Sequence, residues 1–148
     1  MKNTVHNLRD IKTIELETEC RKNGLAMTIQ RRAILDALAS RCDHPTVDQV
    51  YEDIKDTLKG VSRTTVYRVL ETFVSIGIAK KISNPESKAR FDADTQRHHH
   101  LCCLRCGKVL DLHDATLNNL APSKSIEREF AILDYSITFN GICSSCQV

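Results

Sequence analysis

Hydrophobic residues in the first half of the chain recur every three or four positions, which is the spacing of amphipathic helices. This spacing predicts four helices, and each has recognisable start and stop residues. They are expected over residues 10–23, from the capping residue Thr28 through Leu38, from Thr46 to Gly60, and from Ser62 to Ser75. Thr46 and Gln49 have the spacing of a capping box, which marks the start of the third helix.

A two-stranded β-ribbon is expected directly after the fourth helix. Residues 78–82 and 89–91 have strand-like composition and flank a turn signal at Asn84 and Pro85. Helices followed by such a ribbon make a winged helix-turn-helix, whose recognition helix would begin at Ser62. Its first two turns carry side chains that suit the phosphates and base edges of DNA, namely Ser62, Arg63, Thr64, Thr65, Tyr67 and Arg68. The alternative is a solvated helix face without a ligand.

Beyond residue 95 the pattern changes to short strands. Strands are expected at 101–103 and 109–112, followed by a helix through residues 117–130 that Pro122 kinks or restarts. Alternating apolar and polar residues over 135–140 predict a final half-buried strand. The predicted fold class is therefore α+β: an N-terminal winged helix-turn-helix domain followed by a small α/β domain, with a linker near residues 83–92.

Two Cys-x-x-Cys pairs lie in the second half of the chain. Cys103 with Cys106 and Cys143 with Cys146 have the spacing from which two short loops can bind one tetrahedral Zn²⁺. The chain has seven cysteines, and this odd number argues against a complete disulfide framework. We expect one structural zinc site of four thiolates, with Cys102 as the substitute should the register differ by one residue. The competing interpretation is a thioredoxin-like redox pair, although no βαβ pattern surrounds either pair.

Composition and the pattern of apolar residues argue against a membrane-spanning or secreted protein. The 148 residues are 41% hydrophobic, enough for two small domains, and no apolar run approaches the length of a membrane span. The first residues lack the apolar region of a signal peptide, so we expect a cytoplasmic protein. The net charge is +2, and the positive surplus lies in residues 1–82, the part that would meet a polyanion.

A run of three histidines, His98 to His100, precedes the first cysteine pair. In a strand, His98 and His100 would face the same way and could share a metal, whereas His99 would face away. Candidate partners are His44, Asp92 and Asp111. Imidazoles with carboxylates form a harder site than four thiolates and suit Fe²⁺, Mn²⁺ or Zn²⁺, and a metal shared by both expected domains would set the angle between them. The alternative is that His44 is a loop residue and that the aspartates are caps or solvated charges.

Four stretches resemble the ferric uptake regulator (Fur) family in order and spacing. They are Cys42-Asp43-His44-Pro45-Thr46-Val47-Asp48-Gln49-Val50-Tyr51, Ser62-Arg63-Thr64-Thr65-Val66-Tyr67-Arg68-Val69-Leu70, Arg90-Phe91-Asp92, and the His/Cys run ending at Cys106-Gly107-Lys108. The resemblance implies a homodimeric, metal-dependent repressor that binds an inverted repeat in double-stranded DNA and is not an enzyme. It also implies a winged-helix DNA-binding domain over 1–85, a hinge over 86–95 and a dimerisation and metal-binding domain over 96–148.

The resemblance also implies metal ligands. Cys103, Cys106, Cys143 and Cys146 match the structural zinc ligands, and His44, Asp92, His98, His100 and Asp111 match the regulatory site for Fe²⁺ or Mn²⁺. Peroxide sensors of the PerR type carry Asp at two of these positions, where iron sensors tend to carry Glu, and this chain has Asp92 and Asp111. In those sensors peroxide oxidises a ligand histidine at bound Fe²⁺, and the matching oxidisable positions are His44 and His98.

Some positions depart from the pattern of the peroxide sensors. Arg68 resembles the recognition helix of iron sensors, where many peroxide sensors have Asn. An additional metal site of some members would need ligands where this chain has Arg97 and Tyr135, so we expect no such site. The alternatives are an iron or zinc homeostasis repressor with the same fold, a redox enzyme with a reactive cysteine pair, and a protein-interaction module held together by zinc.

Overall fold

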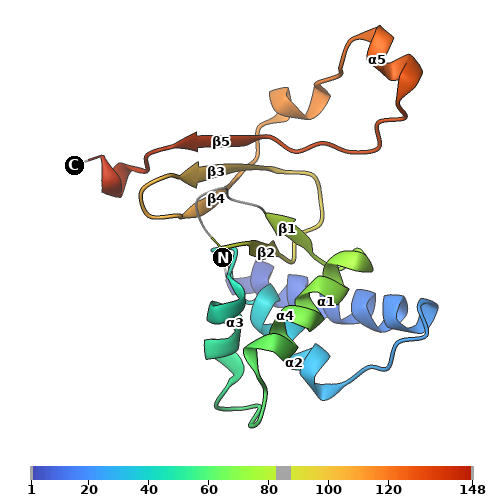
Figure 1. The fold of residues 1–148 in the computed structure, drawn as a ribbon, viewed down its shortest axis with the longest axis vertical. Coiled ribbons are helices and arrows are strands. Elements are labelled where there is room, and N and C mark those ends of the chain that lie inside the picture. The colour runs from blue at the N-terminus through green and yellow to red at the C-terminus, as the bar shows by residue number, and fades with distance from the viewer. Residues whose placement is uncertain (1, 83–87, 148) are drawn as a thin grey trace. The chain divides into compact units, whose positions relative to one another are not determined.

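The computed structural model describes residues 2–82 and 88–147 (Figure 1). Contacts divide the chain into two compact units, Met1–Thr95 and Gln96–Val148, which we call the N-terminal and the C-terminal unit. The boundary falls at the end of the stretch 86–95 that the sequence predicts as a hinge, and the hinge itself stays a prediction.

Four helices form the body of the N-terminal unit. They are α1 (Lys2–Lys22), α2 (Ile29–Ala39), α3 (Val47–Ile54) and α4 (Arg63–Ser75). The predicted caps are confirmed, because the side-chain oxygens of Thr28 and Ser62 accept backbone N–H groups three residues later, at 3.2 and 3.1 Å. Thr46 and Gln49 exchange both hydrogen bonds of the predicted capping box. Three of the four helices therefore begin where their polar caps place them.

Two helix boundaries differ from the prediction. Helix α1 begins at Lys2 rather than near residue 10, since no Gly or Pro interrupts the preceding residues. Helix α3 ends at Ile54, so the prediction that it runs to Gly60 was wrong. The Ile54 carbonyl accepts from the N–H groups of both Thr57 and Leu58, at 3.2 and 2.8 Å, and this shared acceptor closes the helix in a turn.

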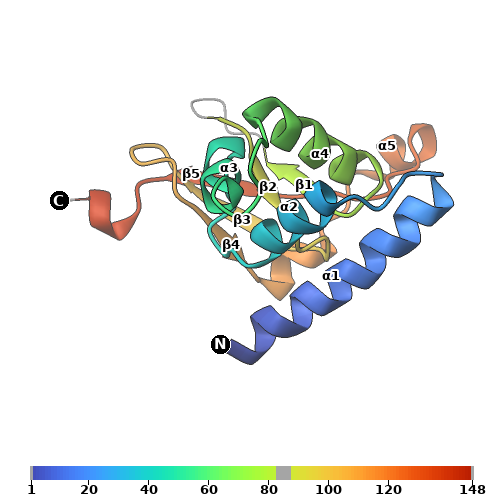
Figure 2. The ribbon, with the colours of Figure 1, turned by 90° about the horizontal axis from the view of Figure 1, so that it is seen from below.

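The core of the N-terminal unit lies where the helices meet. Figure 2 shows α1 running along the edge of the unit, and α1 packs on α2. The largest fully buried side chains come from all four helices and from the strand after them, and include Leu16, Ile34, Leu38, Val50, Val66, Leu70, Phe73 and Phe91. Lys12 on α1 is 3% exposed, and its Nζ donates to Glu15 Oε2 at 2.7 Å and to Thr95 Oγ1 at 3.1 Å. The buried charge is therefore paired.

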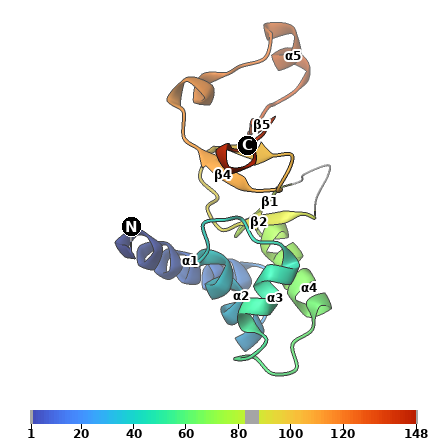
Figure 3. The same cartoon turned by 90° about the vertical axis from the view of Figure 1, so that its left-hand side faces the viewer.

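A two-stranded wing follows α4, as the sequence predicts. Strand β1 (Lys80–Ile82) pairs antiparallel with β2 (Arg90–Asp92), while the expected turn at Asn84 and Pro85 lies outside the described residues. The Phe91 N–H donates to the Pro45 carbonyl at 3.0 Å, which ties the wing to the loop before α3. Figure 3 shows α3 and α4, which are in contact with each other. The N-terminal unit is a winged helix-turn-helix.

The C-terminal unit is built on a three-stranded sheet in the order β4, β3, β5. Strand β3 (His99–Cys103) pairs antiparallel with β4 (Val109–Leu112) and parallel with β5 (Thr138–Gly141). The predicted helix is two short pieces on either side of Pro122, a 3₁₀ turn over Ala115–Asn119 and α5 (Lys124–Glu129). A second 3₁₀ turn, Ser144–Cys146, follows β5. The whole chain is of the predicted α+β class.

The last strand begins three residues later than predicted. The Ile137 N–H donates to the side chain of His99 at 3.1 Å, so it is not available to a sheet ladder. The Tyr135 hydroxyl is likewise used locally, because it donates to the Leu117 carbonyl and accepts from the Leu120 N–H at 3.0 Å. Side-chain hydrogen bonds thus use the Ile137 N–H and the Tyr135 hydroxyl, while the Ile137 carbonyl still accepts from the His100 N–H of β3 at 2.9 Å.

Candidate metal centres and nucleic-acid interface

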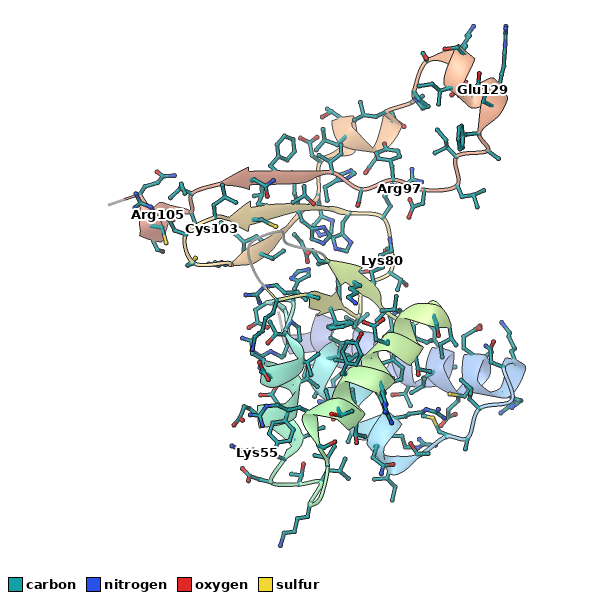
Figure 4. The ribbon with its side chains drawn as sticks, in the orientation of Figure 1. Lys55, Lys80, Arg97, Cys103, Arg105 and Glu129 are labelled. Carbon is teal, nitrogen blue, oxygen red and sulfur yellow. The ribbon has the colours of Figure 1, made fainter. Side chains whose placement is uncertain are left out.

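The four cysteines of the two Cys-x-x-Cys pairs meet at one end of the C-terminal sheet. Cys103 ends β3 and is labelled in Figure 4, and Cys106 lies in the turn between β3 and β4. Cys143 caps the 3₁₀ turn after β5, and Cys146 is the last residue of that turn. Their sulfurs all lie within 4.8 Å of one another. Cys106 Sγ and Cys143 Sγ, one from each pair, are 3.8 Å apart. Four thiolates around Zn²⁺ at about 2.3 Å have sulfurs roughly 3.8 Å apart in a tetrahedron, so this geometry fits zinc.

Backbone groups around the cluster also fit a thiolate site. The Cys143 N–H donates to Cys103 Sγ at 3.3 Å, and the Gly107 N–H donates to the Cys103 carbonyl at 2.9 Å. Gly107 has a φ of 71°, which glycine adopts without the strain of other residues, and it lets the chain turn tightly after Cys106. The loop thus brings both sulfurs of the pair to the same side.

The pKa values of two cysteines are shifted in opposite directions by their neighbours. The Cys143 N–H, followed by backbone hydrogen bonding at Cys106, lowers the pKa of Cys103 to about 6. Contact with the Cys143 and Cys106 sulfurs raises the pKa of Cys146 to about 12. Adjacent sulfurs cannot all ionise without a cation, so a divalent metal is needed to hold four thiolates together.

The cluster also bears on the alternative interpretations of the cysteines. All four sulfurs gather in one group, whereas a thioredoxin-like site needs one accessible pair. Cys103 rather than Cys102 belongs to the group, so the register is the predicted one. The donors therefore suit a closed structural metal site.

The C-terminal unit also gathers two histidines and an aspartate. His98 Nε2 and His100 Nε2 lie 3.2 and 3.8 Å from Asp111 Oδ1, and the two rings are 4.7 Å apart. His100 is the register partner of Asp111 across β3 and β4. His98 Nδ1 lies 2.9 Å from the Gln96 carbonyl, which assigns its proton to Nδ1 and leaves Nε2 as the donor atom for a metal.

His99 faces the other way, as strand alternation predicts. Its Nδ1 accepts from the Ile137 N–H at 3.1 Å, and its Nε2 therefore donates to Asn118 Oδ1 at 3.1 Å. The ring stacks on Tyr135 with centres 5.9 Å apart. Both ring nitrogens are engaged, so His99 is a structural residue and not a metal ligand.

The N-terminal unit contains the remaining two predicted ligands. His44 Nε2 lies 3.3 Å from Asp92 Oδ2, on the second strand of the wing. His44 has a φ of 53°, which is uncommon for a residue with a side chain, and Arg90 Nη1 donates to its carbonyl at 2.9 Å. The Asp94 N–H donates to Asp92 Oδ1 at 2.8 Å. A nitrogen and an oxygen that bind one ion at about 2.1 Å lie roughly 3.0 to 3.5 Å apart. The His44–Asp92 distance of 3.3 Å and the His98–Asp111 distance of 3.2 Å suit a divalent metal.

The first two turns of α4 contain the residues predicted to meet DNA. Thr64 and Arg68 are exposed, and Tyr67 is 48% exposed. Ser62 and Thr65 are engaged in the cap, with their hydroxyl oxygens 3.0 Å apart. The remaining predicted residue, Arg63, is exposed as well but lies against acidic side chains of α3.

One residue that the sequence interpretation missed lies beside this helix. Lys81 on β1 extends over the ring of Tyr67, with its Nζ 5.9 Å from the ring centre, and it donates to Glu71 at 2.5 Å. The basic pair Lys80 and Lys81 in the predicted wing was the available signal, because cations on a wing can contact a DNA backbone. Lys80 is labelled in Figure 4.

Sequence comparison decides the family. The pattern of the Ferric uptake regulator family matches residues 22–140, which is most of the chain. The chain belongs to the ferric uptake regulator family. Members of this Fur family are metal-responsive transcriptional regulators that bind DNA as dimers, and they are not enzymes. No described helix is both long enough and apolar enough to cross a membrane.

Relatives within the Fur family include peroxide-responsive repressors. The chain is 33% identical over 143 residues to the peroxide-responsive repressor PerR of Staphylococcus saprophyticus, covering 93% of this chain and 97% of that protein. The structure of the Fur protein of Helicobacter pylori covers 95% of this chain and 94% of its own with a TM-score of 0.78 at 22% identity, which shows the shared fold. The manganese-bound Fur protein of Pseudomonas aeruginosa is 30% identical with a TM-score of 0.69, covering 86% of this chain and 97% of its own.

The positions of the additional metal site of some Fur members are engaged in other contacts. The Arg97 guanidinium lies 4.9 Å from the centre of the Tyr135 ring and pairs with Asp134 at 3.1 Å (Figure 4). The positive charge of Arg97 would repel a metal ion here, and the Tyr135 hydroxyl is already hydrogen-bonded to the backbone. The donors for a further site are therefore not present at these two positions.

Proposed function

We propose that this chain is a homodimeric, metal-dependent repressor that senses hydrogen peroxide. The observation that carries the proposal is the donor set of two aspartates and three histidines, in a chain 33% identical to a peroxide-responsive repressor. Iron sensors of the family tend to carry Glu where this chain has Asp92 and Asp111. The carboxylate type thus favours peroxide sensing over metal homeostasis.

The proposed regulatory metal joins donors of both units. His44 and Asp92 come from the N-terminal unit, and His98, His100 and Asp111 come from the C-terminal unit. Nitrogen and carboxylate donors suit Fe²⁺ or Mn²⁺, whereas the four thiolates suit a permanent Zn²⁺. A ligand set divided between units changes their relative position when it closes, and a zinc site within one unit does not.

DNA recognition is proposed for α4. Two copies of this helix, related by a dimer axis, would engage the halves of an inverted repeat about 34 Å apart or a multiple of it. The dimer surface is proposed on the C-terminal unit, where Leu110, Leu101 and Phe139 form one row across the sheet by register and are 41, 39 and 48% exposed. A row of large apolar side chains on one face is typical of an interaction surface.

Peroxide sensing is proposed to modify the ligands themselves. Fe²⁺ at these ligands would provide the electron that cleaves peroxide and would regain it when the ring is oxidised, and Mn²⁺ does not do this readily. The net change is one oxygen atom gained by the imidazole of His44 or His98, with water as the second product. An oxidised imidazole binds a metal less tightly, so the metal is released. The arrangement of the two units that binds DNA is then lost.

The experiment selects duplexes from a randomised DNA library with full-length protein loaded in turn with Mn²⁺, Fe²⁺ or Zn²⁺. We expect the Mn²⁺ and Fe²⁺ forms to enrich an inverted repeat. Peroxide at micromolar concentration should then release this duplex from the Fe²⁺ form only, and mass spectrometry should find the added oxygen on a peptide containing His44 or His98. Release from both forms, or release without a modified histidine, contradicts peroxide sensing.

The second candidate is an iron or zinc homeostasis repressor. Arg68 favours it, because this residue resembles the recognition helix of iron sensors, and a manganese-bound Fur structure is 30% identical to this chain. In that case every metal form that binds the duplex would keep it after peroxide treatment. The same selection and release experiment therefore separates the two functions.

A further inference from the structure

The first residue of α4, Arg63, contacts three side chains of α3. Arg63 Nε donates to Asp48 Oδ1 at 3.0 Å, and Arg63 Nη2 donates to Glu52 Oε1 at 3.1 Å. Its guanidinium carbon lies 4.1 Å from the centre of the Tyr51 ring. Asp48 lies three and four residues before the other two partners, so the three form one face of α3.

The same carboxylate of Asp48 also contacts a cation near the wing. Its Oδ2 accepts a hydrogen bond from Lys88 Nζ, while Oδ1 accepts from Arg63. The hydrogen bond from Lys88, and after it the one from Arg63, lowers the pKa of Asp48, so the carboxylate is ionised at neutral pH. Glu52 Oε2 also accepts a hydrogen bond from Lys55 Nζ. Three cations, Arg63, Lys88 and Lys55, therefore share two carboxylates at the start of the recognition helix.

This compensation matters because unrelated DNA is bound mainly through phosphates. A free arginine at a helix N-terminus, where backbone N–H groups also attract anions, would bind the phosphate of any sequence. Asp48 and Glu52 bind that arginine and place their carboxylates where a phosphate would approach. Specificity is a difference between two affinities, and such repulsion lowers the affinity for the wrong partner.

We propose that Asp48 and Glu52 are specificity-determining residues that keep Arg63 from the phosphates of unrelated DNA and release it on the correct sequence. The inference rests on the proposed role of α4 in DNA binding. The side chains of Arg63, Asp48 and Glu52 are 55, 39 and 47% exposed. Ion pairs exposed to this degree are weak, so base contacts elsewhere on α4 suffice to displace them.

The test combines Asp48→Asn with Glu52→Gln, in chains with Arg63 and with Arg63→Gln. Full-length, Mn²⁺-loaded proteins are titrated with the selected duplex and with a scrambled duplex of the same length and composition, over a series of salt concentrations. We expect the double substitution, D48N with E52Q, to raise affinity for scrambled DNA about tenfold and to steepen its salt dependence by about one unit. Affinity for the selected duplex should rise less, and neither gain should appear with Arg63→Gln.

A matched control is Glu17→Gln with Asp36→Asn, which removes the same charge and frees Arg32 and Arg9 from their ion pairs on α1 and α2. An equal gain in this control, or with Arg63→Gln, would make the effect one of net charge and overturn the inference. Unchanged affinity for scrambled DNA would mean that the ion pairs only brace α3 against α4, which overturns it as well. A wild-type protein that enriches no duplex overturns the proposed function and this inference with it.

Discussion

The two units of this chain bury very different amounts of apolar surface. Among its described residues, the N-terminal unit has a core of fifteen buried hydrophobic residues from α1 to α4 and the segments that follow α4. Among residues 96–147 the buried hydrophobic residues are Cys102, Cys103 and Val109. Phe130 and Leu133 in the same unit are 68 and 91% exposed. One unit is thus stabilised by its own core, while the other depends on bonds to metal and on surfaces that a partner can cover.

The metal donors differ between the units in the same way. The four thiolates belong to the C-terminal unit alone, and they close a site in the unit that has little core. The histidines and aspartates are divided, two in one unit and three in the other. A metal bound inside one unit stabilises that unit. A metal bound by ligands from two units makes their arrangement depend on whether the metal is present. On the proposed function, this difference separates a structural metal from a regulatory one.

Cys143→Ser should have the largest effect on the difference between the two units. A structural zinc site contributes on the order of 10 kcal/mol of apparent binding energy, so its loss should unfold the C-terminal unit and leave α1 to α4 intact. Hydrogen exchange of peptides from each unit, together with zinc content, measures this. The matched control is Cys42→Ser, since Cys42 is exposed and lies outside the cluster. Full zinc retention in Cys143→Ser would show that a different donor set binds the metal.

A second substitution tests the core of the N-terminal unit and leaves the zinc ligands in place. Phe73 is fully buried, and Phe73→Ala should lower the free energy of unfolding of this unit by about 3 to 5 kcal/mol while zinc stays bound. Urea unfolding followed by helix circular dichroism measures the loss. Phe130→Ala, at a 68% exposed position, is the control and should change stability by less than about 0.5 kcal/mol. Equal losses in both variants would contradict the difference between the units.

The proposed regulatory site can be weakened without a change in the four cysteines. His100→Ala should lower Mn²⁺ affinity by about 100-fold or more, because it removes a donor rather than a neighbour of one. Zinc content and the hydrogen exchange of both units should stay unchanged. Isothermal titration with Mn²⁺ and metal analysis of the same sample measure both quantities. Unchanged Mn²⁺ affinity would exclude His100 as a ligand.

The smallest expected effect concerns the cap of the recognition helix. Ser62→Ala removes the acceptor of the Thr65 N–H and should cost about 1 kcal/mol of stability, confined to the N-terminal unit. Ser75→Ala, at the other end of α4, is the control and should cost less. The measurement is the urea midpoint of each variant. A loss that also reaches the C-terminal unit would mean that the units do not unfold independently.

Local signals predicted most of the N-terminal unit. Polar caps at Thr28, Thr46 and Ser62 act on the next three residues, so they can be recognised without knowledge of the fold. The end of α3 was missed because the Ile54 carbonyl is shared by two donors in a turn, which periodicity does not encode. The start of β5 was missed because a distant side chain, that of His99, takes the Ile137 N–H.

The candidate sites could likewise be predicted where the signal is local in sequence, and not where the partners are distant. Cys-x-x-Cys spacing predicted the four thiolates directly, since two residues between ligands suit a metal loop. His44 and Asp92 have no such spacing, so the sequence offered them only as candidate partners of the histidine run, and the resemblance to a family was needed to connect them. The neutralised state of Arg63 could not be predicted from its own surroundings in the sequence, because its partners lie 11 and 15 residues earlier on another helix.

The parallel pairing of β3 with β5 has a consequence for the order of folding. The hydrogen bond between Cys143 and Cys103 joins residues 40 positions apart, and the chain must close that loop before the pairing stabilises anything. Helices α1 to α4 pack on their neighbours in the chain and need shorter closures. These helices should therefore pack first, and a refolding chain would pass through a species with a helical core and an open C-terminal sheet, which zinc then closes.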